Sequence, residues 1–276
     1  GQSPVWSASE GLLWWVDPKR AKLHRYKPKT GNTRRYDLPL KASVIALAGG
    51  ELLMAGDLEC GFFDTETEEY NRLIRQADVD ARDRINSGGV APDGSFWFAT
   101  MDGDEVEARS RWFQMRPDRS VPEVDIPPVI IPSTVCFSAD GSPMYTSDTT
   151  EQEILAFDFE APARLSNRRV FATTSTGAGY PDGAALDEDG CIWVAEWDGA
   201  RVVRYRSDGK LDRVVKLPTS RPTACCFGGP ELKTLYITTA RTGLTAFQMD
   251  TQPFAGSLFA LEVDCPGKSC HSWTGR

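Results

Sequence analysis

Short apolar runs recur along the chain, and each is followed by a glycine-containing turn and a second apolar run rich in aromatic residues. Six segments share this order: VWSASEGLLWWVD (5–17), VIALAGGELLMAGD (44–57), GGVAPDGSFWFATMD (88–102), TVCFSADGSPMYTSD (134–148), AALDEDGCIWVAEWD (184–198) and ACCFGGPELKTLYITTA (224–240). Glycine tolerates the positive φ that a tight hairpin needs, so each segment predicts two antiparallel strands.

The spacing of these turns indicates one repeated unit. The turn glycines are Gly11, Gly50, Gly94, Gly141, Gly190 and Gly229, and successive separations are 39, 44, 47, 49 and 39 residues. A third and a fourth strand follow in the units, as in KLHRYKPKTG and TRRYDLP. Propeller blades repeat at roughly 40 to 50 residues. The pattern therefore predicts a single all-β domain over 1–276, a six-bladed β-propeller of four-stranded antiparallel blades around a central channel.

A pair of β-sandwiches is the alternative fold, but a sandwich gives no reason for the same four-strand unit to recur six times. Propellers often close by pairing a strand from one terminus into the last blade. Either the sixth blade is a strand short, or a strand lies outside the sequence given. The sequence leaves both open.

Polar residues stand at the start of the first strand in most units. Those strands line the channel of a propeller, so their starting residues form a ring at one mouth. Counting back from the turn glycines, with allowance for longer turns in the first and last units, gives Gln2, Ala42, Asn86, Ser133, Asp182 and Thr223. Five of these six side chains carry an oxygen, and such oxygens bind hard cations. Alternatively, strand starts beside loops are commonly polar and Asp182 in P-D-G caps a turn; the ring alone supports a polar pocket better than a metal site.

Composition narrows the classes of partner. The formal net charge is −8 and the chain has 41% hydrophobic residues. No basic surplus is present to bind a phosphate backbone, so we expect no nucleic-acid partner. No apolar run approaches the ~18 residues of a membrane span, and we expect no membrane partner.

The seven cysteines are odd in number, and four of them lie in apolar stretches. This favours buried thiols in a reducing, cytoplasmic compartment over a disulfide framework. Cys265 and Cys270 could close a small loop. The only histidines are His24 and His271, so a cysteine/histidine zinc site and Ser-His-Asp catalysis are both disfavoured.

Four motifs in order resemble the gluconolactonase, regucalcin and senescence-marker-protein family of six-bladed propellers. GQSPVW is similar to G-E-x-P-V-W, RINSGGVAPDGSFWFATM to R-x-N-D-G-x-x-D-x-x-G-x-x-W-x-G-T-M, YPDGAALDEDGCIWVA to P-D-G-x-x-x-D-x-x-G-x-x-W-V-A, and CCFGGPELKTLYITTAR to C-x-F-G-G-x-x-x-x-x-L-Y-x-T-x-A. The resemblance covers nearly the whole chain. It implies metal-dependent hydrolysis of sugar lactones, such as gluconolactone, xylonolactone or arabinonolactone.

The resemblance also implies a site. One divalent ion, calcium or zinc, or else manganese or iron(II), is expected at the channel mouth. The Asp ligand falls on Asp182, which is also the expected general base, and the substrate-contacting pair falls on Arg84 and Asn86. Two ligand positions depart from the family, because Gln2 replaces a Glu and Ser133 replaces an Asn.

These two departures leave two functions open. The chain is expected to be a lactone hydrolase with weakened metal binding, since Gln2 lacks the negative charge of Glu and Ser133 is a poorer ligand than an amide. The alternative is a catalytically weakened propeller that binds a divalent cation, a metabolite or a protein. The acidic stretch 102–112 is either a lid over the mouth, in which Asp104 or Glu105 reaches substrate, or a solvated loop.

Overall fold

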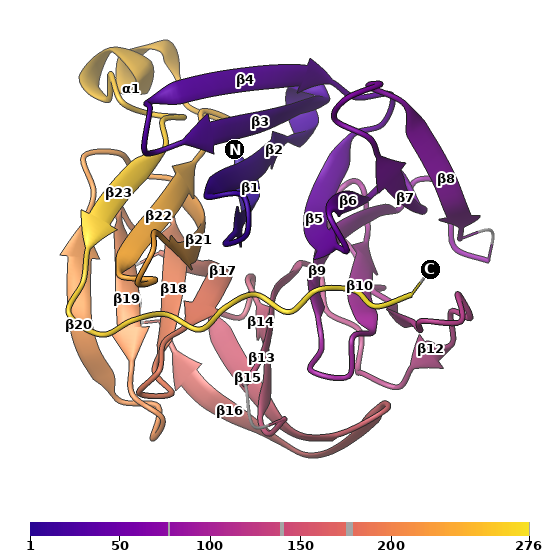
Figure 1. Cartoon of the computed structure of the whole chain (residues 1–276). Helices are drawn as coiled ribbons and strands as arrows, with labels where there is room; N and C mark the ends of the chain where they lie inside the picture. Colours follow the sequence, from indigo (N-terminus) through magenta and orange to yellow (C-terminus); the bar gives the residue numbers. More distant parts are fainter. Residues whose placement is uncertain (77, 139–140, 175–178, 276) are drawn as a thin grey trace.

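The computed structural model describes residues 1–76, 78–138, 141–174 and 179–275, and in this part of the chain six antiparallel sheets surround a central channel (Figure 1). Each sheet is formed by consecutive strands, so each is one blade. The predicted six-bladed β-propeller is confirmed. All six turn glycines have positive φ, between 64° and 100°, as the hairpins require.

Five blades have four strands. The first three blades comprise β1 (Gln2–Ser7), β2 (Leu12–Asp17), β3 (Lys22–Lys27) and β4 (Asn32–Asp37); β5 (Ala42–Ala48), β6 (Glu51–Gly56), β7 (Glu59–Phe63) and β8 (Tyr70–Arg75); and β9 (Arg84–Val90), β10 (Phe96–Met101), β11 (Trp112–Met115) and β12 (Glu123–Val124). The fourth and fifth comprise β13 (Pro132–Phe137), β14 (Met144–Asp148), β15 (Glu153–Glu160) and β16 (Arg164–Thr173); and β17 (Tyr180–Leu186), β18 (Ile192–Trp197), β19 (Arg201–Tyr205) and β20 (Leu211–Lys216).

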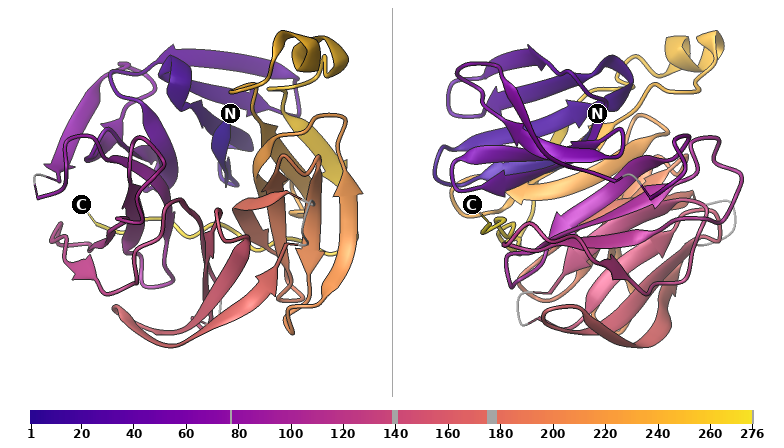
Figure 2. Two further views of the ribbon diagram at one scale, coloured as in Figure 1. Left: turned by 180° about the vertical axis from the view of Figure 1, so that it is seen from behind. Right: turned by 90° about the vertical axis from the view of Figure 1, so that its right-hand side faces the viewer.

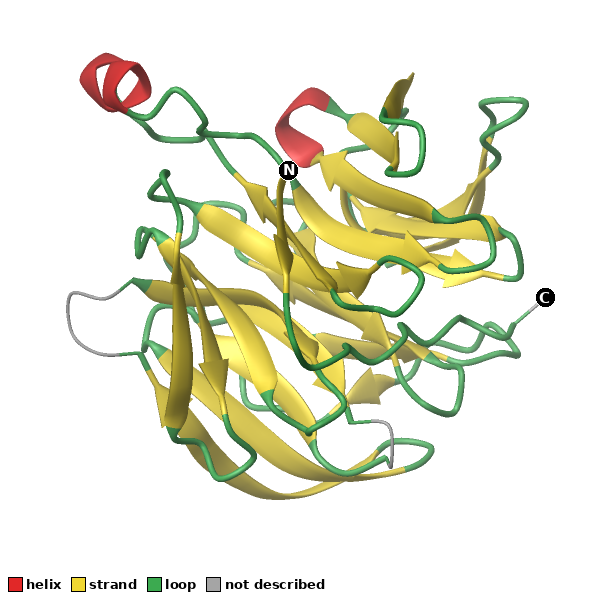
Figure 3. Cartoon of the chain, turned by 60° about the vertical axis from the view of Figure 1, so that its left-hand side comes forward, coloured by secondary structure: helices red, strands yellow, loops and turns green. Residues whose placement is uncertain are grey.

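The sixth blade departs from the four-strand prediction. Within the described residues it has three strands, β21 (Pro222–Gly228), β22 (Thr234–Thr239) and β23 (Phe259–Glu262). Between β22 and β23 the chain makes an excursion that carries the helix α1 (Ala246–Thr251), which projects from the edge of the propeller (Figure 3). The outer position of this blade is therefore not filled by a strand from the described chain.

The innermost strands form a closed ring. β1 lies beside both β5 and β21, so the first blade contacts the second and the last. The backbone nitrogen of Gly1 donates a 2.8 Å hydrogen bond to the carbonyl oxygen of Thr239, and Thr223 Oγ1 donates to the carbonyl oxygen of Gly1 at 2.7 Å. These bonds join the first residue to the sixth blade. The left view of Figure 2 shows the circular arrangement of the blades.

The core lies between blades rather than at the centre. Six clusters of buried apolar side chains each occupy one interface between neighbouring blades. Trp97 of the third blade, for example, packs edge-on against Phe137 and Phe159 of the fourth, with ring centroids 5.5 and 5.7 Å away. Because apolar burial holds adjacent blades together, the channel itself is left free for polar groups.

The chain after β23 crosses the face of the propeller opposite the ring of strand starts (Figure 1). Short bridges pair Gly267 with Asp187 of the fifth blade and Ser272 with Leu47 of the second. Trp273 ends the crossing in the cluster between the second and third blades, 2% exposed and in contact with Phe62. We call residues 263–275 the C-terminal strap.

Candidate active site

One cavity of about 1450 Å³ occupies the channel and opens at the mouth where the inner strands begin. The predicted site residues that line it are Gln2, Arg84, Asn86, Ser133 and Asp182, together with the ring residue Thr223. The structure therefore brings all five into one space, although they come from four blades and are up to 180 residues apart in sequence.

A β-bulge interrupts every inner strand close to the ring. In β9, for example, Ile85 pairs with Thr100 and Ser87 with Ala99, so Asn86 is the extra residue of the bulge. The register of β1, β5, β13, β17 and β21 shifts at the equivalent place. A bulge re-aims the side chains beside it, which turns polar residues toward the cavity in strands that are otherwise apolar.

The bulge corrects one ring position. Ala42 is fully buried in the cluster between the first and second blades and does not line the cavity. Its neighbour Ser43 is the extra residue of the β5 bulge and does line it. The extra residue lies seven residues before the turn glycine in β5 but eight before it in β9, because the turn between β5 and β6 is one residue shorter. Counting eight residues back therefore misses Ser43 by one position.

Two amide side chains bridge to the next blade. Gln2 Nε2 donates a 2.8 Å hydrogen bond to the carbonyl oxygen of Ser43, and Asn86 Nδ2 donates a 2.9 Å bond to that of Pro132. The bond fixes which end of each amide points at the backbone. Gln2 Oε1 accepts no hydrogen bond from the described residues, so it is free to bind a cation or a hydroxyl.

The hydroxyl of Ser133 is oriented by its neighbour. Thr149 Oγ1 lies 2.5 Å from Ser133 Oγ and donates its only proton to the carbonyl oxygen of Pro181 at 2.9 Å. Ser133 must therefore be the donor in its bond to Thr149. Its lone pairs remain available, and like Gln2 it presents an acceptor oxygen.

Asp182 provides the carboxylate of the mouth. Its side chain is enclosed by the channel walls yet partly accessible from the cavity, and it makes no ion pair with the described residues. Burial raises its pKa to about 7, against the opposing effects of the Gly183 backbone N–H and the positive charge of Arg84. A carboxylate with a pKa near neutrality is suited to accept a proton at physiological pH.

Arg84 connects the ring to the acidic stretch 102–112. Its NH1 donates to Asn86 Oδ1 at 2.6 Å, and its NH2 forms an ion pair with Glu105 at 3.1 Å. Glu105 and Gly103 line the cavity, whereas Asp104 is not among the described lining residues. Of the two acidic residues considered from the sequence, Glu105 is thus the one at the mouth.

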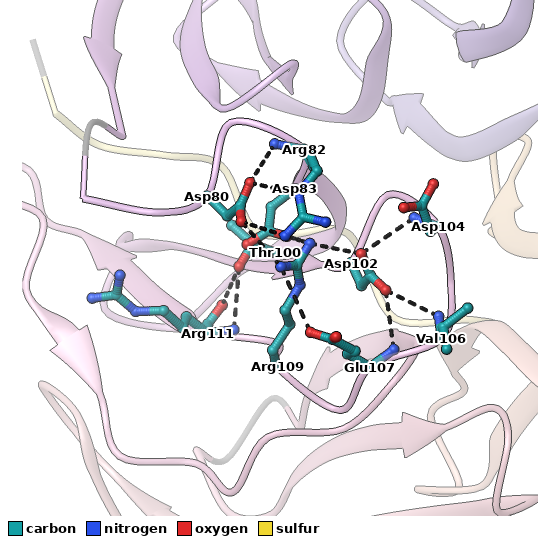
Figure 4. A network of polar contacts seen from close by, with 10 residues as sticks. All are labelled: Asp80, Arg82, Asp83, Thr100, Asp102, Asp104, Val106, Glu107, Arg109 and Arg111. Carbon is teal, nitrogen blue, oxygen red and sulfur yellow. Dashed lines mark hydrogen bonds and ion pairs between the residues drawn. The ribbon is translucent and has the colours of Figure 1, made fainter.

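Arg109 organises the loop that carries Glu105 (Figure 4). Its guanidinium lies 2.6 Å from Asp102, 2.7 Å from Asp83 and 3.2 Å from Asp80. Asp102 in turn accepts hydrogen bonds from the backbone nitrogens of residues 104, 106 and 107. These N–H groups lower the pKa of Asp102 to about 2, so it stays ionised opposite Arg109. No motif in the sequence indicates this role for Arg109.

The donor set of the mouth fits a hard divalent cation. Gln2 Oε1, Ser133 Oγ and the Asp182 carboxylate are oxygens whose own donor groups, where present, already bond to neighbouring atoms. An enclosed carboxylate with a raised pKa gains most from a nearby positive charge. With one carboxylate and two neutral oxygens, the set is weaker than one with two carboxylates.

A second acidic cluster has different chemistry. Asp187, Asp189 and Cys265 bring one ligand atom each within 4.8 Å of one another. However, Asp187 is fully buried and already accepts hydrogen bonds from Cys191 N, Trp193 Nε1 and Arg204 Nε. Arg204 neutralises this cluster by pairing with Asp187 and Asp189, so the cluster is a structural ion pair.

All seven cysteines are free thiols, so Cys265 and Cys270 do not form a disulfide.

Comparison with known protein families shows to which family the chain is related. Residues 1–241 match the profile of the SMP-30/gluconolactonase/LRE-like region. The chain belongs to this family. The predicted resemblance is confirmed, and with it the expectation of a lactone hydrolase at the level of the family.

Several relatives cover nearly the whole chain. The 6-deoxy-6-sulfogluconolactonase of Pseudomonas putida is 32% identical over 97% of this chain and 92% of its own length. The pentonolactonase XacC of Haloferax volcanii is 34% identical, again over 97% of this chain and 92% of its own. Regucalcin of Xenopus laevis is 31% identical over 95% of this chain and 90% of its own.

A solved structure shares the fold closely. The calcium-binding protein regucalcin from Agrobacterium tumefaciens superimposes with a TM-score of 0.93 at 25% identity, covering 99% of this chain and 93% of its own. None of the helices in the described part of the chain has the length and apolar character needed to cross a membrane.

Proposed function

We propose that the chain hydrolyses sugar lactones to aldonic acids at the channel mouth, with a divalent cation as cofactor. The observation that carries this proposal is the set of free oxygens at the mouth, in which the enclosed carboxylate of Asp182 lies within the electrostatic influence of Arg84. Family membership and relatives named as gluconolactonase-type, arabinolactonase and pentonolactonase enzymes support the reaction class.

The reaction adds water to the ring ester. Asp182 accepts a proton from the attacking water as the water oxygen bonds to the carbonyl carbon. It then returns the proton to the ring oxygen as the bond between that oxygen and the carbonyl carbon breaks. Gln2, Ser133 and Asp182 would hold the divalent cation, which would supply Lewis-acid stabilisation of the charge on the carbonyl oxygen. Calcium or zinc suits this set, and manganese or iron(II) is also compatible with oxygen ligands.

Arg84 and Asn86 orient the substrate. The guanidinium of Arg84 is held on both sides, by Asn86 and by Glu105, so its remaining N–H groups have fixed directions. Fixed donors that bind sugar hydroxyls hold the ester carbonyl in place for attack. The substrate class is an aldonolactone of the gluconolactone, xylonolactone or arabinonolactone type.

The free thiols favour a reducing compartment, in line with a cytoplasmic location.

The alternative function, a propeller that only binds a cation, a metabolite or a protein, rests on the weak ligand set. We expect Gln2→Glu to raise metal affinity about 10- to 100-fold, because it adds a second carboxylate. Glutamate has no proton to donate to the Ser43 carbonyl, so part of that gain is lost.

One experiment separates the two functions. Calcium, zinc, manganese and iron(II) are titrated calorimetrically into wild type, Gln2→Glu and the matched control Gln76→Glu, whose side chain lies outside the cavity. Lactone hydrolysis is followed in parallel with a pH indicator. If no metal supports hydrolysis in wild type or Gln2→Glu, the enzyme proposal fails and the binding function remains. If Asp182→Ala hydrolyses lactone as fast as wild type, the proposed site is wrong.

A further inference from the structure

Two large aromatic side chains stand together at the mouth. Tyr180 begins β17 and Trp197 ends β18, and both residues line the cavity. They are direct partners in the antiparallel ladder between these two strands. Partners across a ladder project from the same face of a sheet, so the phenol and the indole are neighbours. We call Tyr180 and Trp197 the aromatic wall.

The aromatic wall faces the sixth blade. Side chains alternate between the two faces of β18, and Trp193 and Ala195, on the same face as Trp197, pack into the cluster between the fifth and sixth blades. Residues 241, 242 and 255–257, from the excursion after β22, line the same cavity. The wall therefore lies on the side of the mouth where the fifth blade meets the sixth.

Tyr180 is accessible, unlike the aromatic residues deeper in the channel. Its side chain is 41% exposed. Two phenylalanines also line the cavity, but Phe137 and Phe227 are 7% and 2% exposed and pack into the clusters between blades. Among the described lining residues, Tyr180 thus has the largest exposed fraction of any aromatic side chain.

The indole of Trp197 is held in one orientation. The guanidinium carbon of Arg221 lies 4.8 Å from the centroid of the ring. Arg221 is itself fixed, because its Nε donates a 2.7 Å hydrogen bond to Asp198 and its NH1 donates to the carbonyl oxygen of Thr242. A cation fixed against an aromatic face restrains the ring. Arg221 is therefore a positioning residue for the wall.

The wall complements the polar groups of the mouth. Tyr180 lies two residues before Asp182 on the same inner strand, whereas Arg84 and Asn86 come from the third blade. Binding sites for small molecules combine aromatic surface with a few polar groups that fix orientation. A sugar lactone has both kinds of partner, because its hydroxyls project from the edge of the ring and its C–H groups form an apolar face.

We propose that the aromatic wall stacks against the C–H face of the lactone ring and so selects the closed ring over the open-chain acid. This inference rests on the proposed lactone hydrolysis at the same mouth. Tyr180 and Trp197 contact the ring face while Arg84 and Asn86 bind hydroxyls, which places the ester carbonyl beside Asp182. The product is an open chain without a ring face, so the wall holds the substrate but not the product.

Kinetics with D-gluconolactone tests the contact. We expect KM to rise about tenfold in Tyr180→Ala and in Trp197→Leu, with kcat changed less. Tyr180→Phe and Trp197→Phe keep an aromatic ring and should recover most of the KM. Phe247→Ala, which removes an exposed ring outside the cavity, should leave KM unchanged. Wild-type KM in Tyr180→Ala overturns the proposal, as does a Tyr180→Phe variant with the KM of Tyr180→Ala.

Thermal denaturation of the same samples separates contact from stability. Because Tyr180 is 41% exposed, Tyr180→Ala should melt close to wild type. A raised KM at an unchanged melting temperature supports the stacking contact. A KM that rises only in variants with a lowered melting temperature overturns it, because the wall would then serve blade packing alone.

Ligand binding keeps this inference separate from the proposed hydrolysis. D-Gluconolactam, a ring analogue with an amide in place of the ester, and open-chain gluconate are titrated calorimetrically into wild type and Tyr180→Ala. If no lactone is hydrolysed, the enzyme proposal fails and these titrations judge the wall. An affinity about tenfold lower for the lactam, with gluconate affected little, supports it. Equal lactam affinities, equal losses for both ligands, or a wild type that does not bind the lactam overturn it.

Discussion

Arg84 NH1 donates a 2.6 Å hydrogen bond to Asn86 Oδ1, while Asn86 Nδ2 donates to the carbonyl oxygen of Pro132 in the next blade. The two residues are neighbours on one face of a bulged strand. The bond to Pro132 leaves Asn86 only one orientation of its amide, and that orientation in turn directs the guanidinium. The position of Arg84 is therefore set by the junction of the third and fourth blades.

Arg84→Lys should impair substrate binding even though it keeps the charge. A lysine ammonium lacks the planar fork that serves Asn86 and Glu105 together. We expect kcat/KM for the lactone to fall about 10- to 100-fold, mainly through KM. Steady-state kinetics measures this, with Arg75→Lys on β8, away from the cavity, as the matched control. A variant with wild-type KM would show that Arg84 does not orient the substrate.

Arg109→Met should also raise KM, although Arg109 does not line the cavity. Loss of the guanidinium leaves Asp83 and Asp102 facing each other in a buried position, so the loop that holds Glu105 against Arg84 loosens. We expect a lower melting temperature and a KM raised about tenfold, with kcat less affected. Kinetics and thermal denaturation on the same samples measure both.

Two variants test whether this effect is positional. Arg109→Lys keeps a positive charge among the carboxylates and should recover much of the KM. Arg111→Met removes a neighbouring arginine that pairs with the exposed Glu123, and should change KM little. If Arg109→Met lowers the melting temperature but leaves KM unchanged, Arg109 serves stability alone.

The repeat made the fold predictable, because apolar runs and turn glycines are local sequence signals and occur six times along the chain. The same counting selected Ser133 and Asp182, which both line the cavity. Ala42 was misplaced by one residue, because the turn between β5 and β6 is one residue shorter than the turn between β9 and β10. The number of residues in a turn depends on which residues of the flanking strands pair, and the position of the turn glycine alone does not show that.

The polar network around the site could not be read from the sequence for another reason. The donation from Gln2 to Ser43 spans two blades, and Arg109 meets Asp80 and Asp83 across some thirty residues of chain. Such contacts depend on how the folded chain places loops and strands that are distant in the sequence. The motif match could supply Arg84 and Asn86 as family positions, but Arg109 lies in a stretch whose acidic composition is equally typical of a solvated loop.

The C-terminal strap should contribute strongly to stability. Trp273 is 2% exposed between the second and third blades, so Trp273→Ala leaves a large cavity there. We expect the free energy of unfolding to fall by about 3–5 kcal/mol. Trp273→Phe should cost less, and Phe247→Ala, at an aromatic ring that is 75% exposed on α1, should cost almost nothing. Denaturant titration measures all three, and equal midpoints for Trp273→Ala and Phe247→Ala would contradict a structural role for the strap.

Asp182→Asn should stabilise the metal-free protein at pH 8 while abolishing lactone hydrolysis. Burial raises the pKa of Asp182 from 3.8 to about 7. Between pH 3.8 and pH 7 the Asp182 carboxyl is ionised in the unfolded chain but protonated in the folded one, so the free energy of unfolding of wild type falls as the pH rises. Above pH 7 the carboxyl is ionised in both states, and the folded protein bears the full cost of the buried charge. Water in the cavity screens that charge, and we expect a gain of about 1–2 kcal/mol in the variant. Thermal denaturation after chelation, at pH 5 and pH 8, measures the difference.

Asp208→Asn is the control, because the backbone N–H of Lys210 lowers the pKa of Asp208 and its ionisation stabilises the fold. If wild type and Asp182→Asn lose the same stability between the two pH values, the carboxylate is solvated in the folded protein and is not the base that the proposed reaction requires.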